Sequence, residues 1–593
     1  MRDSRMLRDS GMEWRRFSRM RRALIFLTAL TPLLQDFVQV RGQAPARLHA
    51  SLGSQTEASN MASTYVPIES WVYPAIERLA VAGYVQTAFA GLRPWTRIGV
   101  ARLIAEAQEQ QVNDVNENVD PQIELLLNDL SREFARELRS QNGIRNREAG
   151  FETVDFRSTS IHGAPLTDGF HSAQTIVNDY GRPYGQGENT YTGVSYRAAY
   201  GSFSGYIDAE LQQSALAPQP PTSSDAAIAA ADFTPEAALG PHTGFTRGRL
   251  LDAYISYTTH SNQFSFGKQS LWWGPGKGST MLLSNNAEPL PMLRYDRVRP
   301  FEIPGPGRLL GPISVQLFVG RLSGQQFTSP RGQVFGQAGV PYIDQPFIHG
   351  QKVAIKPTSN LELSVSRTTI FAGQGVPLTT HTVLRSLFST STNNDQLDPG
   401  DRRVAFDAQY RIPGLRNWLT GYVDTFTDDK LFPLAYPKST AWTPGIYLSH
   451  IPHLSHMDLR VEGSLTPRRV YFPGFYYDNV HYLSGYTNNR QLMGSWIGRE
   501  SNGFQAWSTW WLSSRSSIQA SVRHSTESAQ FLHGGDLLDL KLAADIAIKQ
   551  DWQLRAAAQE ERWRFPLFSI TNTPTHNQTV TIQLSYRPTP KSF

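Results

Sequence analysis

The sequence predicts a mainly β fold: a large antiparallel transmembrane β-barrel of about 18 strands, preceded by a small periplasmic α-helical bundle. Three observations indicate this fold. Apolar side chains alternate with polar ones through most of residues 150–593. The chain contains 11% aromatic residues, yet its mean hydropathy is −0.37. A short apolar segment near the N-terminus follows a strongly basic one, which is the layout of an exported protein.

The formal net charge of +5 comes from one end of the chain. Residues 1–22 contain eight arginines and three acidic residues, which account for all of it. The rest of the sequence is neutral, so we expect no nucleic acid among its partners. The absence of cysteine excludes disulfide bridges and thiol chemistry.

Residues 1–48 are predicted to be a signal peptide. The apolar run from Ala23 to Leu34 is too short to cross a bilayer, for which roughly 20 residues are needed. A basic segment followed by such a run is typical of a secretory signal. The sequence from Met20 resembles a normal signal more closely than the sequence from Met1, and the cleavage site is unclear. A buried amphipathic helix is the alternative.

Residues 62–142 are predicted to form the helical bundle. Ser70 can cap a first amphipathic helix, and a second follows Thr96. Asp120 and Pro121 are a cap and a first-turn proline for a third helix. Three short amphipathic helices of this kind bury their apolar faces against one another.

The first part of this bundle resembles the S-layer homology pattern. The resemblance covers one imperfect copy and rests on Trp71, Ala75, Ile76, Leu79, Gly83, Pro94, Thr96 and Arg97. It implies that the bundle contacts a cell-wall polymer. A packed helical cap with no polymer partner explains the same residues, so both interpretations stay open.

Residues 150–593 are predicted to form the barrel. Val194 and Tyr196 lie on an apolar strand face, whereas Asp208 and Lys541 occupy charged positions on the opposite faces of later strands. A soluble β-sandwich alternates in the same way. The length of the pattern and the signal peptide favour a barrel, because only a closed sheet pairs every backbone group in lipid. Long loops are expected between strands, notably at 214–244 and 328–346.

Several blocks of this region resemble the capsule assembly (Wzi) family of outer-membrane proteins. The blocks are "FGKQSLWWGPG" with "LLSNNAEPLP", "LGPISVQLFVGRL", "HGQKVAIKPTSNLELSVSRTTIFAGQGVPLT", and "RRVAFDAQYRIPGL" with "GYVDTFTDD". The resemblance implies a bacterial outer-membrane barrel with its helical bundle in the periplasm. It also implies a lectin-like receptor, not an enzyme, that holds exported capsular polysaccharide or exopolysaccharide to the cell surface.

The glycine-rich segment of the first block supplies most of the candidate glycan contacts. It is not a phosphate-binding P-loop, because Gly278 follows Lys277 where Ser or Thr is required. Indole rings can stack on a sugar, amides can bind hydroxyls, and cations can bind the carboxylates of acidic sugars. The candidates are Trp272, Trp273, Lys277, Asn285, Asn286 and Arg294. Alternatively, the tryptophans are girdle anchors, or the segment is a constriction loop packed in the lumen.

We expect no catalytic residue, cofactor or metal. His450, His453 and His456 recur every three residues, but Pro452 and the flanking strand pattern place them in a loop. The acidic cluster at 424–430 is typical of a solvated turn. An alternative function is a carbohydrate-type porin or diffusion channel. Outer-membrane lipid and the barrel insertion machinery are expected partners in either case.

Overall fold

The computed structural model describes most of the chain beyond the predicted signal peptide, which lies outside the described residues. The described part runs from residue 60 to residue 592, with gaps at 114–120, 142–143, 145, 218–220, 233–242, 329–333, 336–343, 390–399, 416–417, 429–431, 452, 470, 570, 572 and 589–590.

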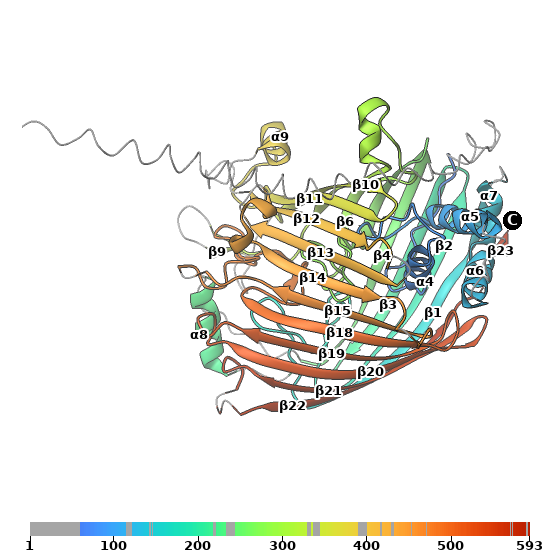
Figure 1. Ribbon diagram of the computed structural model, residues 1–593. Helices are drawn as coiled ribbons and strands as arrows, with labels where there is room; N and C mark the ends of the chain where they lie inside the picture. Colours follow the sequence, from blue (N-terminus) through green and yellow to red (C-terminus); the bar gives the residue numbers. More distant parts are fainter. Residues whose placement is uncertain are drawn as a thin grey trace, which may run out of the picture. The chain divides into compact units, whose positions relative to one another are not determined.

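Eighteen antiparallel strands close into a barrel, which confirms the predicted architecture (Figure 1). Consecutive barrel strands pair in chain order, and β22 pairs with β1 to complete the ring, with Phe156 opposite Leu584. The strands are β1 (Arg147–His162), β2 (Gly187–Tyr200), β3 (Phe203–Ser214), β4 (Phe245–Thr259), β5 (Asn262–Gln269), β6 (Leu290–Arg297), β7 (Ile313–Arg321), β10 (Phe347–Thr358), β11 (Leu361–Phe371), β12 (Asp401–Arg411), β13 (Leu419–Asp428), β14 (Ala441–Leu448), β15 (Met457–Leu465), β18 (Ser501–Trp511), β19 (Ser517–Glu527), β20 (Gly535–Lys549), β21 (Trp552–Arg564) and β22 (Thr575–Tyr586).

The short pairs β8–β9 and β16–β17 stand apart from the barrel sheet, and β23 extends the edge of β1. Their bounds are Phe327–Thr328, Val334–Phe335, Thr487–Asn488, Gln491–Leu492 and Lys591–Ser592.

The barrel wall has an apolar outer face and a polar inner face. In β2, Val194 and Tyr196 are exposed, whereas the intervening Ser195 and Arg197 are buried. This period of two follows from the pleat of a strand, which sends successive side chains to opposite faces. An outward apolar band is what lipid requires of a barrel. The predicted alternation is therefore present in three dimensions.

The two ends of the barrel differ in the length of their connections. Short turns join β2 to β3, β10 to β11 and β20 to β21 at one end, which we call the short-turn end. The opposite, long-loop end carries the segments 163–186, 215–244 and 466–500. Two helices belong to long-loop connections, α8 (Thr222–Ala231) and α9 (Thr380–Phe388).

Four helices near the start of the described chain pack at the short-turn end. They are α4 (Val72–Val81), α5 (Arg97–Asn113), α6 (Pro121–Glu133) and α7 (Ala135–Gln141). Ile76, Val100 and Leu126 are fully buried in their shared core. The amide of Ala62 donates to the carbonyl of Gly201 in the β2–β3 turn at 2.9 Å, which fixes this end of the chain to the barrel. None of the described helices combines the length and hydropathy needed to span a membrane.

Inside the barrel, the segments 163–186, 270–289 and 466–500 pack together, and we call them the lumen plug. Met281 and Tyr477 from the plug have no exposed surface, and they belong to one apolar cluster with Phe426 of the wall. The hydroxyl of Tyr477 donates to the carbonyl of Met281 at 2.7 Å. The long connections thus fold inward, and side chains fill part of the lumen.

Candidate functional site

The glycine-rich turn of the plug surrounds a carboxylate that the barrel itself supplies. Glu462 on β15 accepts hydrogen bonds from the amides of Lys277 at 2.6 Å and Gly278 at 2.9 Å. The hydroxyl of Tyr422 donates to the same carboxylate at 2.6 Å. A Cβ on Gly278 would lie 1.8 Å from the side-chain oxygen of Gln505 and 2.6 Å from the ring of Trp507, so a larger residue would have to displace these side chains. The turn binds an anion as a docking contact within the protein.

Three of the six predicted glycan contacts are buried and bonded to other residues in the interior of the protein. Trp273 is 1% exposed and donates to Gln316 at 2.7 Å. Asn286 joins two other plug segments, because its amide donates to the carbonyl of Leu492 at 3.2 Å and its side-chain oxygen accepts from the amide of Asn178 at 3.0 Å. Arg294 on β6 is 1% exposed and pairs with Asp296 at 2.7 Å. These contacts correspond to the constriction-loop interpretation of the segment.

The other three predicted residues, Trp272, Lys277 and Asn285, line one cavity in the lumen. The cavity has a volume of about 560 Å³ and lies between the plug, the inner wall and the helical bundle. The backbone of Trp272 pairs with that of Arg93, with two hydrogen bonds of 3.0 Å. This pairing places the cavity near the bundle rather than at the long-loop face.

The polar groups of this cavity are suited to hydroxyl-rich ligands. Among the described residues, the side-chain oxygens of Asn178 and Asn285 have no hydrogen-bond donor. Burial, which Asp458 partly offsets, lowers the pKa of Lys277 to about 8. The ammonium of Lys277 lies 5.5 Å from the ring centre of Trp507 and is exposed to the cavity. The cavity therefore offers hydrogen-bond acceptors and one cation.

The long-loop end carries aromatic side chains that the sequence analysis did not single out. Tyr471 is 88% exposed and Phe472 is 66% exposed, both in the segment 466–500. Arg468, three residues before Tyr471 in the chain, is also exposed. An aromatic pair beside arginine is visible in the sequence as "PRRVYFPG", but only the fold shows that these rings face solvent.

Buried ion pairs hold three long-loop segments together beneath this face. His171 lies between Asp168 at 2.6 Å and Asp232 at 2.7 Å. Arg499 contacts the second carboxylate oxygen of Asp232 at 2.6 Å and Asp478 at 3.2 Å. Burial disfavours charge on His171, but the two carboxylates raise its pKa to about 10. The network fixes the arrangement of the loops that present the outer aromatics.

The fold defines a class of protein: a closed β-barrel of the outer-membrane type, with a polar interior that its own loops occupy. The family model named capsule assembly protein Wzi matches residues 157–579. The chain belongs to this family, as the sequence resemblance predicted. No curated protein matches the chain.

One solved structure gives the same architecture at low sequence identity. Wzi of Escherichia coli, a carbohydrate-binding β-barrel of the outer membrane involved in group 1 capsule assembly, superposes with a TM-score of 0.62 at 13% identity. That match covers 89% of this chain and 100% of the other. OprD of Pseudomonas aeruginosa gives a TM-score of 0.39 at 10% identity, covering 75% of this chain and 94% of OprD.

Proposed function

We propose that this protein binds exported capsular polysaccharide or exopolysaccharide and attaches it to the cell surface without catalysing a reaction. The observation that carries the proposal is the match to the capsule assembly family over residues 157–579. The E. coli relative of the same fold is a carbohydrate-binding barrel, which supports the same role here.

The orientation of the barrel follows from its two ends. Outer-membrane barrels place long loops outside the cell and short turns in the periplasm. We therefore place the lumen plug and Tyr471 toward the exterior, and the helical bundle in the periplasm. Such a location requires export, which we assign to the signal peptide at residues 1–48, and insertion by the barrel insertion machinery.

The exposed rings of Tyr471 and Phe472 are our proposed surface contacts for the polymer. Their outer faces are free to stack on sugar rings, and Arg468 beside them can bind an acidic substituent. Trp272, Lys277 and Asn285 remain proposed contacts for a saccharide that reaches the lumen cavity.

Attachment is favoured over the alternative of a diffusion channel. Met281, Leu282 and Tyr477 of the plug have no exposed surface in the middle of the barrel. A packed core of this kind occupies space that a porin leaves to water. Steady ion conductance of the purified protein in planar bilayers would contradict this preference.

The S-layer-like residues support a role in packing. Trp71, Ile76 and Leu79 lie in the core of the bundle, with 8% exposure or less. We therefore propose that the bundle is a helical cap on the barrel. Binding of purified protein to isolated cell wall would contradict this and favour a wall contact.

The test of the proposed function compares cell-bound with released polysaccharide. A deletion strain is complemented with the wild-type gene, with the Tyr471→Ala/Phe472→Ala double variant, or with the control Leu309→Ala. Leu309 is 80% exposed in η2 (Gly305–Leu310), at the short-turn end. We expect polymer to move into the medium in the deletion strain and in the double variant, with total synthesis unchanged. An unchanged distribution in the deletion strain would reject the proposal.

A further inference from the structure

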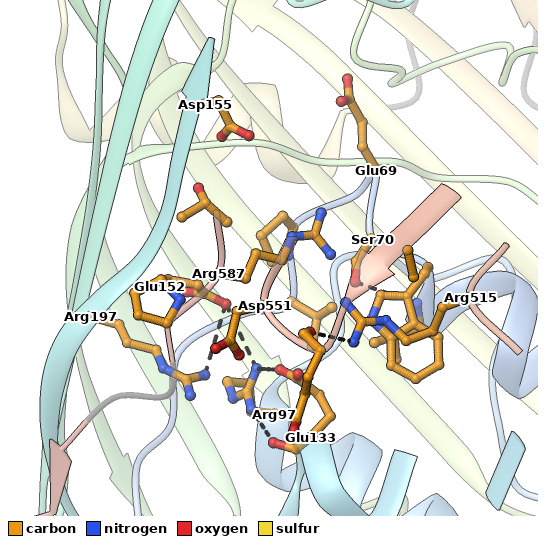
Figure 2. A pocket seen from close by; sticks show the side chains of 18 of the residues that line it. Glu69, Ser70, Arg97, Glu133, Glu152, Asp155, Arg197, Arg515, Asp551 and Arg587 are labelled. Carbon is orange, nitrogen blue, oxygen red and sulfur yellow. Dashed lines mark hydrogen bonds and ion pairs between the residues drawn. The ribbon is translucent and has the colours of Figure 1, made fainter. Parts of the chain in front are cut away.

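A second cavity lies at the short-turn end, among the helical bundle, β1 to β3 and the strand turns (Figure 2). Its volume is about 720 Å³, within the range of roughly 300–1,000 Å³ that is usual for small-molecule sites. The exposed side chains of Arg139 and Lys549 are part of its lining. The cavity is therefore reached from the short-turn side and is remote from the long-loop face.

Several arginines of this cavity are neutralised by carboxylates of the fold. Arg97 lies 3.1 Å from Glu133, and Figure 2 shows this pair in the lining of the cavity. Arg197 lies 3.7 Å from Glu148 and 3.8 Å from Glu152. The first pair lies within the bundle and the other two join β2 to β1, while Arg97 also lies 3.7 Å from Glu152 of β1, so these cations serve as structural contacts.

Arg515 and Arg587 differ from these arginines because no carboxylate of the described residues pairs with them. Among the described residues, neither forms an ion pair, and the Nε of each has no hydrogen-bond acceptor. Arg515 lies in the turn between β18 and β19, where its Nη1 donates to the carbonyl of Gln550 at 2.9 Å. Arg587 directly follows β22. In Figure 2 both guanidinium groups project into the cavity.

These two cations also lie within electrostatic range of each other. Burial and the like charge of Arg555 lower the pKa of Arg587, Asp155 and Glu133 oppose this shift, and the charge of Arg515 adds a smaller lowering. Of the two carboxylates that act on Arg587, Glu133 pairs with Arg97 of the bundle and Asp155 accepts a hydrogen bond of 3.3 Å from the amide of Gln583 on β22, while Asp551 also lines the cavity. Gathering like charges at a partly buried site costs free energy, which a bound anion would offset.

We propose that this cavity binds an acidic saccharide, with its carboxylate between Arg515 and Arg587. Planar guanidinium groups bind carboxylates through paired, charge-assisted hydrogen bonds. Trp71, which is 8% exposed, holds the Arg515 guanidinium 5.4 Å from its ring centre. The exposed polar side chains of Ser513 and Gln550 in the same lining can bind sugar hydroxyls. This site is separate from the outer aromatic face and does not rest on the proposed attachment function.

The test is isothermal titration calorimetry of the full-length protein in detergent micelles, with trigalacturonate as the acidic probe and maltotriose as its neutral counterpart. Arg515→Gln and Arg587→Gln are measured singly, and Arg308→Gln, an exposed site in η2, is the matched control. We expect trigalacturonate to bind wild type and the control equally. Each cavity variant should bind about tenfold more weakly, because a charge-assisted contact is lost. Maltotriose should give no heat.

Three results would overturn the proposal. The first is the absence of trigalacturonate binding to wild type. The second is that both cavity variants bind trigalacturonate as tightly as wild type. The third is that inorganic phosphate binds in place of the saccharide. If Arg587→Gln fails to fold, Arg515→Gln decides, because its side chain lies in a turn. The Tyr471→Ala/Phe472→Ala variant should keep wild-type trigalacturonate binding, which separates this site from the proposed surface contact.

Discussion

The guanidinium of Arg460 on β15 donates to the carboxylate of Glu77 on α4 at 2.5 Å, across 383 residues of sequence. Arg460 also lies 4.1 Å from the ring centre of Tyr447 on the neighbouring strand. The side chains of Arg460 and Glu77 are 4% and 20% exposed. This buried pair is a direct link between the helical bundle and the inner wall of the barrel.

Glu77→Ala should loosen the bundle while the barrel stays folded. Removing one partner leaves the Arg460 charge uncompensated, which costs about 3 kcal/mol in a buried pair. Hydrogen–deuterium exchange over residues 72–113 should rise, while exchange of the barrel strands is unchanged. Glu124→Ala, at an exposed position of α6, is the control. Unaltered exchange in Glu77→Ala would show that the pair does not hold the bundle.

The His171 network should make the loops sensitive to alkaline pH. Because its folded-state pKa of about 10 exceeds the ordinary 6.5, charged His171 stabilises the loops fully below pH 6.5 and progressively less as the pH rises toward 10. At the acidic end, burial opposes ionisation of Asp232, but His171 lowers its pKa to about 2, so this contribution is lost as the pH falls from 3.8 toward 2.

Thermal unfolding in detergent between pH 6 and pH 10 tests this dependence. The wild-type melting temperature should fall as the pH rises, and His171→Gln should be less stable at pH 6 and lack most of that fall. His533→Gln, an exposed histidine in the β19–β20 connection, should behave as wild type. A parallel fall in wild type and His171→Gln would assign the effect to other groups.

Gly350→Ala should disturb the contact between the plug and the wall. A Cβ on Gly350 of β10 would lie 2.1 Å from the ring of Phe318 and 2.8 Å from the ring of Trp273. Overpacking of this kind costs about 1–3 kcal/mol. Gly421→Ala on β13 is the matched control, since a Cβ there meets no atom within 4 Å. Equal melting temperatures for the two variants would contradict the close packing.

We expect the two tryptophans to differ in their contribution to stability, which Trp273→Ala and Trp272→Phe test. Truncating Trp273 leaves a void in the core and should lower the free energy of unfolding by about 3–5 kcal/mol. On gels, the band of the folded barrel should therefore disappear at a lower heating temperature than in wild type. Trp272→Phe keeps an aromatic face but loses the hydrogen bond of the indole to the carbonyl of Gly276 at 3.2 Å, so it should cost only about 1 kcal/mol. If Trp273→Ala were as stable as wild type, the plug core would not depend on this ring.

Much of the fold follows from local pattern. The alternation around Val194 and Tyr196 predicts strands with one apolar face, and helix start signals at Thr96 and Pro121 stand where α5 and α6 begin. Less of the candidate site can be predicted from the sequence. Trp272 and Trp273 are adjacent and chemically identical, yet one lines a cavity and the other packs in the core. Sequence spacing does not distinguish them, because the difference depends on which surfaces surround each ring.

The sequence by itself determined the period of the strands, the helical segments that precede them and the family resemblance, because these depend on residues close together in the chain. The tertiary structure decided that the glycine-rich turn encloses Glu462, 185 residues away from Lys277, and that Arg515 and Arg587 line one cavity. Such pairings depend on the register of strands around a closed barrel and on which loops fold inward. The strand register and the inward fold of the loops are fixed only when the barrel has closed.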